Sequence, residues 1–318
     1  MLQSLRDTEL GHQEWELMSS QEHFEEVWNI MLPSISKCID QFIDDIIHSN
    51  PTYNSKANYS LFKAKITDSH DTVAFKYQSV FSDDNMEEYE QDVDSFKGIA
   101  LKKECDVIRN SLNSKSESLN DWKRAFFKTK AQLMYDTFRN ILDYAKSYDK
   151  NTSEERLNAI DTIDAIGFSS MDEAGCYLPA VFGTGIVSNI TNHLFPRTFP
   201  GHFKLGMYSL YFLSNRVCIN MPSEISEFLM VKDSVHSKTN IIEADHNYYF
   251  PYETFSLYSL RISRLLNAAI LGKLGDVVSP DDRYVMINAF YEFVFNCNKD
   301  TVSTLTGNDD ILKFGYTF

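Results

Sequence analysis

Long apolar runs, signal-peptide features and paired cysteine motifs are all missing from this chain of 318 residues. No stretch of 18 or more apolar residues occurs, so the sequence predicts no membrane-spanning helix. The N-terminus lacks the basic start and apolar stretch of a signal peptide, and a cytoplasmic location is therefore expected. The five cysteines are far apart and odd in number, which favours free thiols.

Several complete catalytic and cofactor motifs are also missing. There is no phosphate-binding Gly-x4-Gly-Lys-Ser/Thr loop and no Gly-x-Ser-x-Gly nucleophile elbow. The segment VFGTGIVSN (residues 181–189) has a Gly-x-Gly but not the third glycine of the dinucleotide fingerprint. A lone Gly-x-Gly is a weak signal, so we interpret it as a turn and predict no cofactor.

The metal-ligating residue types do not form a recognisable set. Glu243 and His246 have the i, i+3 spacing of carboxylate-bridged di-iron bundles, but the sequence has no second Glu-x-x-His. His193, His202 and Asp245 would have to converge with His246 in space to form another kind of site. No Cys-x-x-Cys occurs. The sequence therefore predicts no metal site.

Positive charge is scarce, because 30 basic residues face 45 acidic ones and the formal net charge is -15. This balance argues against broad, non-specific nucleic-acid binding, which needs cations to replace phosphate counterions. Residues 1–50 have ten acidic and two basic side chains, whereas residues 101–150 have eleven basic and seven acidic ones. The acidic excess is typical of a solvated surface, with a basic partner or an anionic face that mimics DNA as the alternatives.

Apolar residues recur mostly at helical spacing, so we predict a mainly α-helical, multi-helix fold. At most a small β element is expected, as a hairpin near residues 217–231. Residues 59–81 fit either two edge strands or a helix. The segment 281–297 is apolar nearly all round, which predicts a central helix with Phe290 and Phe293 buried. The expected helices cover residues 20–48, 86–112, 121–148, 251–272 and 281–297.

Composition changes at YDKNTSEER (residues 148–156), a polar and turn-prone stretch. We therefore predict an acidic N-terminal helical region over residues 1–150. Residues 151–318 are denser in Phe, Tyr, Leu and Ile, and we predict an aromatic-rich helical core domain there.

The segment PRTFPGH places Arg197 and His202 on one expected loop between helices at 186–195 and 203–214. The Arg-x4-His spacing resembles that of HEPN-type ribonucleases, in which the arginine steadies the cleaved phosphate and the histidine exchanges protons near neutral pH. That resemblance implies a metal-independent ribonuclease of toxin or antiviral-effector type, with both side chains solvated. The alternative, which we favour, is a rigid structural turn in which Phe199 packs inward and Gly201 relaxes the backbone.

The expected helix over residues 121–148 has a basic face. Its lysines and arginines alternate with Trp122, Phe126 and Phe127, so this face could contact nucleic-acid phosphates. A charge run on one helix face is more often only solvated, and we favour that interpretation. The basic residues of interest are Lys123, Lys128, Lys130 and Arg139.

Tyrosine is concentrated in residues 246–264, where Ser256, Ser259 and Ser263 recur at helical spacing. This pattern fits close helix packing in the core, or a subunit interface. Because no catalytic set is complete, we expect a cytoplasmic protein-interaction or assembly subunit. It would use the acidic N-terminal helix and the Tyr-rich segment to bind a protein partner or a second copy. A ribonuclease using Arg197 and His202 is the alternative.

Overall fold

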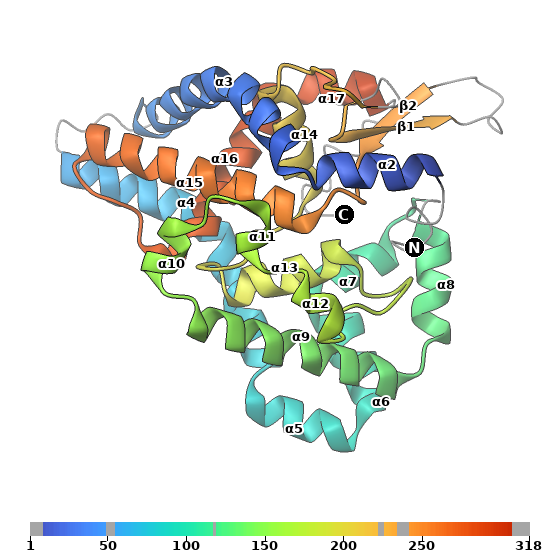
Figure 1. Cartoon of the computed structure of the whole chain (residues 1–318). Helices are drawn as coiled ribbons and strands as arrows, with labels where there is room; N and C mark the ends of the chain where they lie inside the picture. Colours follow the sequence, from blue (N-terminus) through green and yellow to red (C-terminus); the bar gives the residue numbers. More distant parts are fainter. Residues whose placement is uncertain (1–8, 49–54, 117–118, 222–225, 234–241, 307–318) are drawn as a thin grey trace.

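The computed structural model of the chain describes residues 9–48, 55–116, 119–221, 226–233 and 242–306, and these are 76% helical. The predicted mainly α-helical class is therefore confirmed (Figure 1). The helices, in chain order, are α2 (Glu9–Met18), α3 (Gln21–His48), α4 (Ser55–Val80), α5 (Asp83–Gln91), α6 (Val93–Ser95), the π-helix η1 (Phe96–Glu104), α7 (Asp106–Asn113), α8 (Asn120–Lys128), α9 (Ala131–Asn151), α10 (Glu154–Ala159), α11 (Ile163–Ile166), α12 (Ser170–Glu173), α13 (Thr184–Leu194), α14 (Lys204–Leu213), α15 (Tyr252–Leu274), the 3-10 helix η3 (Pro280–Asp282), α16 (Arg283–Cys297) and α17 (Lys299–Thr306).

One small antiparallel sheet is present in the described part of the chain. Strand β1 (Leu229–Asp233) pairs with β2 (Ile242–His246), with Leu229 opposite His246. A small β element is present as expected, but the hairpin near 217–231 was wrong in its pairing: among the described residues of that range only 229–231 lie in a strand, and 215–220 form turns and irregular structure. Residues 59–81, for which strands were an alternative, belong almost entirely to helix α4.

Helix α16 lies at the centre of the fold, as its all-round apolar sequence predicted. It packs against α14, α15, α4 and α3. Phe290 is fully buried, with its ring centroid 5.7 Å from that of Phe42 on α3. Phe293 is only partly buried, so the prediction for that residue was wrong.

Residues from both predicted regions form the main hydrophobic cluster. Helix α3 packs along α15, and α4 contacts α13, α15 and α16 (Figure 1). Phe24 on α3, for example, has its ring centroid 4.3 Å from that of Tyr258 on α15. The acidic region and the aromatic-rich region therefore bury their apolar faces against each other.

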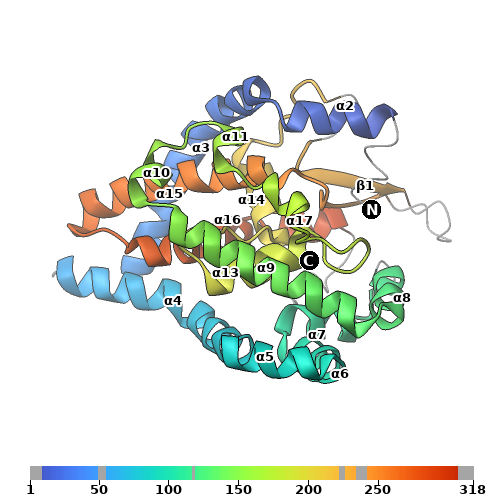
Figure 2. The ribbon, with the colours of Figure 1, turned by 60° about the horizontal axis from the view of Figure 1, so that its bottom comes forward.

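The predicted helix over 121–148 is two helices, because α8 ends at Lys128 and α9 begins at Ala131. Figure 2 shows α4, α5 and α6 following one another along one edge of the molecule, with α8 at the end of that edge.

Between α6 and α7 the chain forms η1, a π-helix of nine residues. π-helices are rare, usually a single turn, and often lie at functional sites.

Candidate functional site

The predicted loop between two helices is present. Helix α13 ends at Leu194, and α14 begins at Lys204. Between them a turn forms, in which the carbonyl of Phe195 accepts the backbone N–H groups of Thr198 (3.1 Å) and Phe199 (3.0 Å). Arg197 and His202 therefore lie on one short loop, as the spacing predicted.

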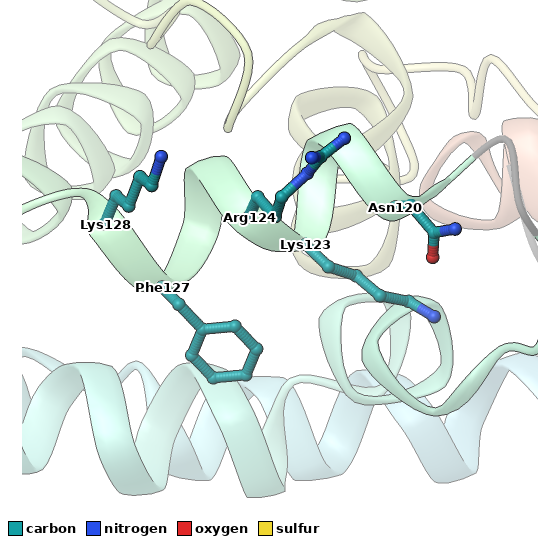
Figure 3. Close-up of a pocket in the computed structure, with 5 residues that line it drawn as sticks. All are labelled: Asn120, Lys123, Arg124, Phe127 and Lys128. Atoms are coloured by element: carbon teal, nitrogen blue, oxygen red, sulfur yellow. The ribbon is translucent and has the colours of Figure 1, made fainter.

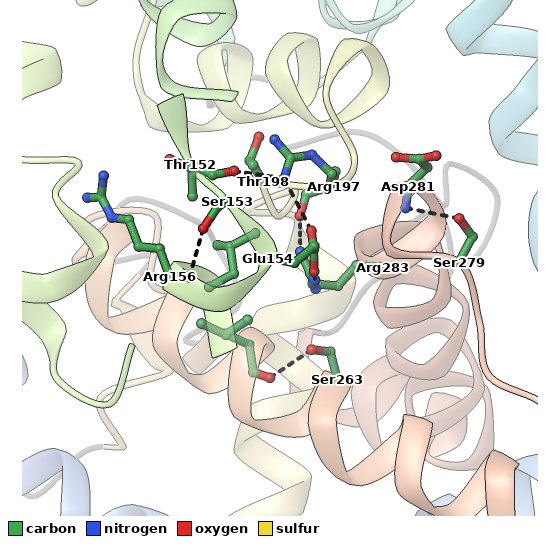
Figure 4. Close-up of polar contacts among 12 residues, drawn as sticks. Thr152, Ser153, Glu154, Arg156, Arg197, Thr198, Ser263, Ser279, Asp281 and Arg283 are labelled. Carbon is green, nitrogen blue, oxygen red and sulfur yellow. Dashed lines mark hydrogen bonds and ion pairs between the residues drawn. The ribbon is translucent and has the colours of Figure 1, made fainter. Parts of the chain in front are cut away.

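The side chain of Arg197 is directed into the protein, and only 19% of it is exposed (Figure 4). Its guanidinium donates to the carbonyl of Thr152 at 2.8 Å and also to that of Asp149. It forms ion pairs with the carboxylates of Asp149 (3.0 Å) and Glu154 (3.2 Å). The donors that a ribonuclease would need for phosphate are thus engaged by the end of α9 and the start of α10.

The same loop is bonded to the start of α16. Arg283 donates from Nη1 to the carbonyl of Arg197 at 2.6 Å and forms an ion pair with Glu154. The backbone N–H of Tyr284 donates to the carbonyl of Pro196 at 3.0 Å. The side chain of Arg283 is only 7% exposed. Two arginines thus share one glutamate and fasten α10, the loop and α16 together.

His202 is buried, with 4% of its surface exposed. Its backbone N–H donates to Ser188 Oγ at 3.0 Å, and its ring meets that of Phe255 at an edge, with 4.8 Å between the centroids. Its Nε2 has no hydrogen-bond partner in the described structure. Burial, and to a smaller extent the nearby His246, lower the pKa of His202 to about 3. The imidazole is therefore neutral near pH 7.

The surroundings of Arg197 and His202 do not converge on one reactive position. In the described structure, the polar groups that hold Arg197 and the rings that enclose His202 have no residue in common. A general base also needs contact with its substrate and a pKa near the working pH. Neither condition is met by His202 in this conformation.

Phe199 packs inward as expected of a structural turn, whereas Gly201 has no positive φ and its role is close packing, not relaxation of the backbone. Phe199 is fully buried; its ring stacks on that of Phe168 at 5.0 Å, and its carbonyl accepts from Asn192 Nδ2 at 2.8 Å. A Cβ added to Gly201 would lie 2.0 Å from a ring carbon of Phe203. The aromatic and glycine positions of this loop thus serve packing.

Of the histidines considered as metal ligands, His202 and His246 lie near each other, whereas His193 contacts other residues. His193 stacks on His70 with 5.0 Å between the ring centroids, and its Nδ1 lies 2.8 Å from the carbonyl of Asn189. His246 lies on β2 beside Asp245, with Nδ1 2.8 Å from the carboxylate. Within the described residues, no group of three or more His, Cys, Asp or Glu side chains could hold a metal ion.

A second candidate site lies on α8 and η1, where a depression of about 580 Å³ is lined by Asn120, Lys123, Arg124, Phe127 and Lys128 (Figure 3). Phe127 is 57% exposed, and Lys102 of η1 lies over its ring with Nζ 5.5 Å from the centroid. We call this the α8–η1 surface, and it comprises Lys102, Lys123, Arg124, Phe127 and Lys128.

The cations of the α8–η1 surface differ in how they are engaged. Arg124 pairs with the exposed Asp121, and Lys123 donates to the carbonyl of Ser114. Lys102 and Lys128 are exposed, and neither forms an ion pair with a described residue. Lys102, which lies over the exposed ring, and Lys128, which points away from it in Figure 3, are therefore available to a partner.

Only part of the predicted basic face gathers at this surface. Lys123 and Lys128 line it, whereas Lys130 directly precedes α9 without a capping hydrogen bond and Arg139 pairs with Asp143 on that helix at 3.2 Å. Sequence reasoning missed Lys102, which lies 25 positions before Phe127 in the chain. No spacing rule connects residues so far apart, so only the fold reveals this contact.

The acidic N-terminal helix uses much of its charge within the molecule. Arg261 of α15 binds both carboxylate oxygens of Glu25 on α3, at 2.8 and 2.6 Å. Lys273 of α15 lies 3.0 Å from each of the carboxylates of Asp40 and Asp44. Half of the six acidic side chains of α3 are thus paired with α15.

Most of the Tyr-rich segment, residues 246–264, is core. Tyr252 and Tyr258 are buried, as are the three serines at helical spacing. Ser259 hydrogen-bonds Tyr291 at 3.0 Å, and the hydroxyl of Tyr252 donates to the carbonyl of Pro200 at 2.7 Å. Tyr248, which is 41% exposed, remains accessible at the start of the segment.

No protein-family model, curated protein or solved structure matches this chain. None of the described helices combines the length and apolar character needed to cross a membrane. The functional argument therefore rests on the geometry of the two candidate sites.

Proposed function

We propose that this chain is a protein-interaction or assembly subunit that binds its partner through the α8–η1 surface. The observation that carries the proposal is Phe127, an aromatic ring 57% exposed on the basic helix α8, with Lys102 of η1 over the ring. Aromatic and arginine side chains are enriched at protein interfaces and supply most of the binding energy there. Burying the exposed part of one ring contributes favourably at roughly 25 cal/mol per Å².

The loop with Arg197 and His202 supports this choice over the ribonuclease. Its arginine is held by Asp149 and Glu154, and its histidine is neutral and enclosed by aromatic rings. A phosphate could reach Arg197 only by displacing two carboxylates. That displacement would break two ion pairs and the hydrogen bonds to the carbonyls of Asp149 and Thr152, which makes it unfavourable.

The surfaces expected from the sequence contribute less to the proposed interface. The pairing of Glu25, Asp40 and Asp44 with α15 leaves the acidic helix with fewer free charges. The buried tyrosines of residues 246–264 could meet a partner only if the core opened. The cytoplasmic location stays a prediction.

A site-specific photo-crosslinking residue at position 127 tests the proposal in cells that make the protein. The matched control is the same residue at position 75, because Phe75 on α4 is also an exposed phenylalanine, at 76%. We expect one defined crosslinked protein from position 127 and none of that identity from position 75. The identified protein is then purified and its binding is reconstituted.

The reconstituted complex should be lost with Phe127→Ala and Lys128→Glu and kept with Phe75→Ala. Unchanged binding by all three variants would contradict the proposal. Cleavage of RNA by the wild-type protein without added metal, weakened by Arg197→Lys and His202→Gln, would favour the ribonuclease instead.

A further inference from the structure

The chemistry of the α8–η1 surface also indicates what binds there. We infer that its occupant is an acidic protein segment that carries an apolar side chain, an inference that rests on the function proposed above. The apolar side chain would cover Phe127, and carboxylates beside it would meet Lys102 and Lys128. This arrangement matches the exposed ring with the two cations of this surface that have neither an ion-pair nor a hydrogen-bond partner in the described structure.

The geometry of η1 prepares this surface before any partner arrives. Lys97 and Lys102 are five positions apart, and the bonds of a π-helix join residues five apart, so the two side chains lie on one face. Lys97 donates to the carbonyls of Phe127 (3.1 Å) and Thr129 (2.6 Å), which fastens the C-terminal end of α8 to η1. Lys102 then reaches the ring of Phe127.

This fastening matters because binding is weakened by the entropy of ordering a flexible surface. A ring and cations that are already held in place lose less freedom when a partner binds. Phe126, the neighbour of Phe127, is buried and has Lys97 5.7 Å from its ring centroid. The rings of Phe126 and Phe127 meet at an edge, with 5.7 Å between the centroids, so the anchored ring supports the exposed one.

A nucleic acid fits this surface less well than an acidic protein segment does. Proteins that bind single strands stack successive bases on several rings. Among the aromatic residues of α8 only Phe127 is exposed. Phe126 is buried, and Trp122 is half-buried with its Nε1 donating to the carbonyl of Val181 at 2.9 Å. A protein segment needs only one ring as an anchor.

The charge around the surface points the same way. Seven of the twelve residues from Asp83 to Asp94 are acidic, and this segment leads directly into η1. A nucleic-acid strand has a phosphate at every nucleotide, so these acidic residues would repel the part of it that extends beyond the cations. A protein segment can have its carboxylates only where the cations are, so its remaining length avoids that repulsion.

Fluorescence anisotropy of labelled probes with the full-length protein tests this inference. The first probe is a peptide of Asp and Glu residues around a central Leu-Phe pair. The second has Gly-Ser in place of Leu-Phe, and the third is a single-stranded oligouridylate of equal charge. We expect the first probe to bind tightest, with about tenfold weaker binding for Gly-Ser, since an aromatic anchor commonly contributes that much.

Variants assign the binding to the α8–η1 surface. Phe127→Ala and the double change Lys102→Glu with Lys128→Glu should each weaken the first probe about tenfold or more, while Phe127→Trp should bind like the wild type. Two matched controls on α4, Phe75→Ala and Lys65→Glu, should leave the affinity unchanged, because both residues are exposed and lie outside the surface.

Three results would overturn the inference. Tighter binding of the oligouridylate, lost with the same variants, would make the surface a nucleic-acid site. Equal binding of the two peptides would remove the role of Phe127. If neither peptide binds but the partner crosslinked at position 127 still forms a complex with the purified protein, the acidic chemistry is refuted and the proposed function stands.

Discussion

Replacing Arg197 with alanine removes a side chain that connects three segments of the fold. The guanidinium donates to the carbonyls of Asp149 and Thr152 at the end of α9 and pairs with Glu154 at the start of α10. Its loss would also leave Glu154 with Arg283 as its remaining cation among these residues. Because the side chain of Arg197 is only 19% exposed, water can replace few of these contacts.

The expected cost follows from the number and kind of these contacts. A hydrogen bond to a charged group contributes about 1.5–3 kcal/mol, and removing one partner of a buried ion pair costs about 3–5 kcal/mol. The carboxylates of Asp149 and Glu154 are about one-third exposed, at 28% and 32%, so their charge is partly solvated when the arginine is gone. We therefore expect Arg197→Ala to lower the free energy of unfolding by about 2–4 kcal/mol.

Thermal unfolding followed by circular dichroism measures this effect, and a fall in melting temperature of about 3–6 °C is expected for a chain of this length. Arg139→Ala is the matched control, since it removes the same side chain from an exposed i, i+4 pair with Asp143. Such pairs contribute about 0.3–0.5 kcal/mol. If the two variants melt alike, the reasoning is refuted and Arg197 is free for another role.

Three further predictions test the packing and the buried histidines. Gly206→Ala should destabilise the protein by about 1–3 kcal/mol, because the new Cβ would lie 2.9 Å from a ring carbon of Phe255. Gly272→Ala should stabilise it by about 0.5–1 kcal/mol, since nothing lies within 4 Å of that Cβ. Chemical denaturation compares the two variants. Phe290→Ala should cost about 3–5 kcal/mol, and wild-type-like melting would show that α16 is not central. The folded-state pKa values of His193 and His202, about 4 and 3, lie below the unfolded value near 6.5. As the pH falls, the unfolded state therefore binds protons before the folded state does. The stability is full above about pH 6.5 and falls below it by about 1.4 kcal/mol per pH unit for each histidine. Urea titrations at about pH 7 and pH 5 that show no such loss would contradict the burial of both rings.

The helical class and several elements could be predicted because they depend on local periodicity. The apolar spacing over residues 281–297 predicted the central α16, and the helices on either side of Arg197 were placed within two residues of α13 and α14. Such patterns succeed where one face of a helix must be buried against the rest of the protein. They say less about which neighbour a helix meets.

The elements that could not be predicted depend on contacts between distant residues. Strand β1 does not pair with the adjacent residues 215–220 but with β2, so sequence proximity gave the wrong partner. The break between α8 and α9 has neither Gly nor Pro at positions 129 and 130. Instead, Lys97 of η1 donates a hydrogen bond to the carbonyl of Thr129 at that point. Helix propensity depends on neighbouring residues and cannot predict a bond to a distant one.

The same limit explains why the Arg-x4-His spacing could not decide between catalysis and structure. Spacing requires only that Arg197 and His202 share a loop, and a turn satisfies that requirement as well as an active site does. Their chemistry is set by residues elsewhere in the chain: Glu154 neutralises the arginine, and Phe255 encloses the histidine. Phe127 shows the converse, because it belongs to an ordinary-looking basic helix and becomes a candidate anchor only through Lys102 on η1. In this protein, the charge and solvent access of a side chain therefore distinguish a binding residue from a structural one, and both are properties of the folded chain.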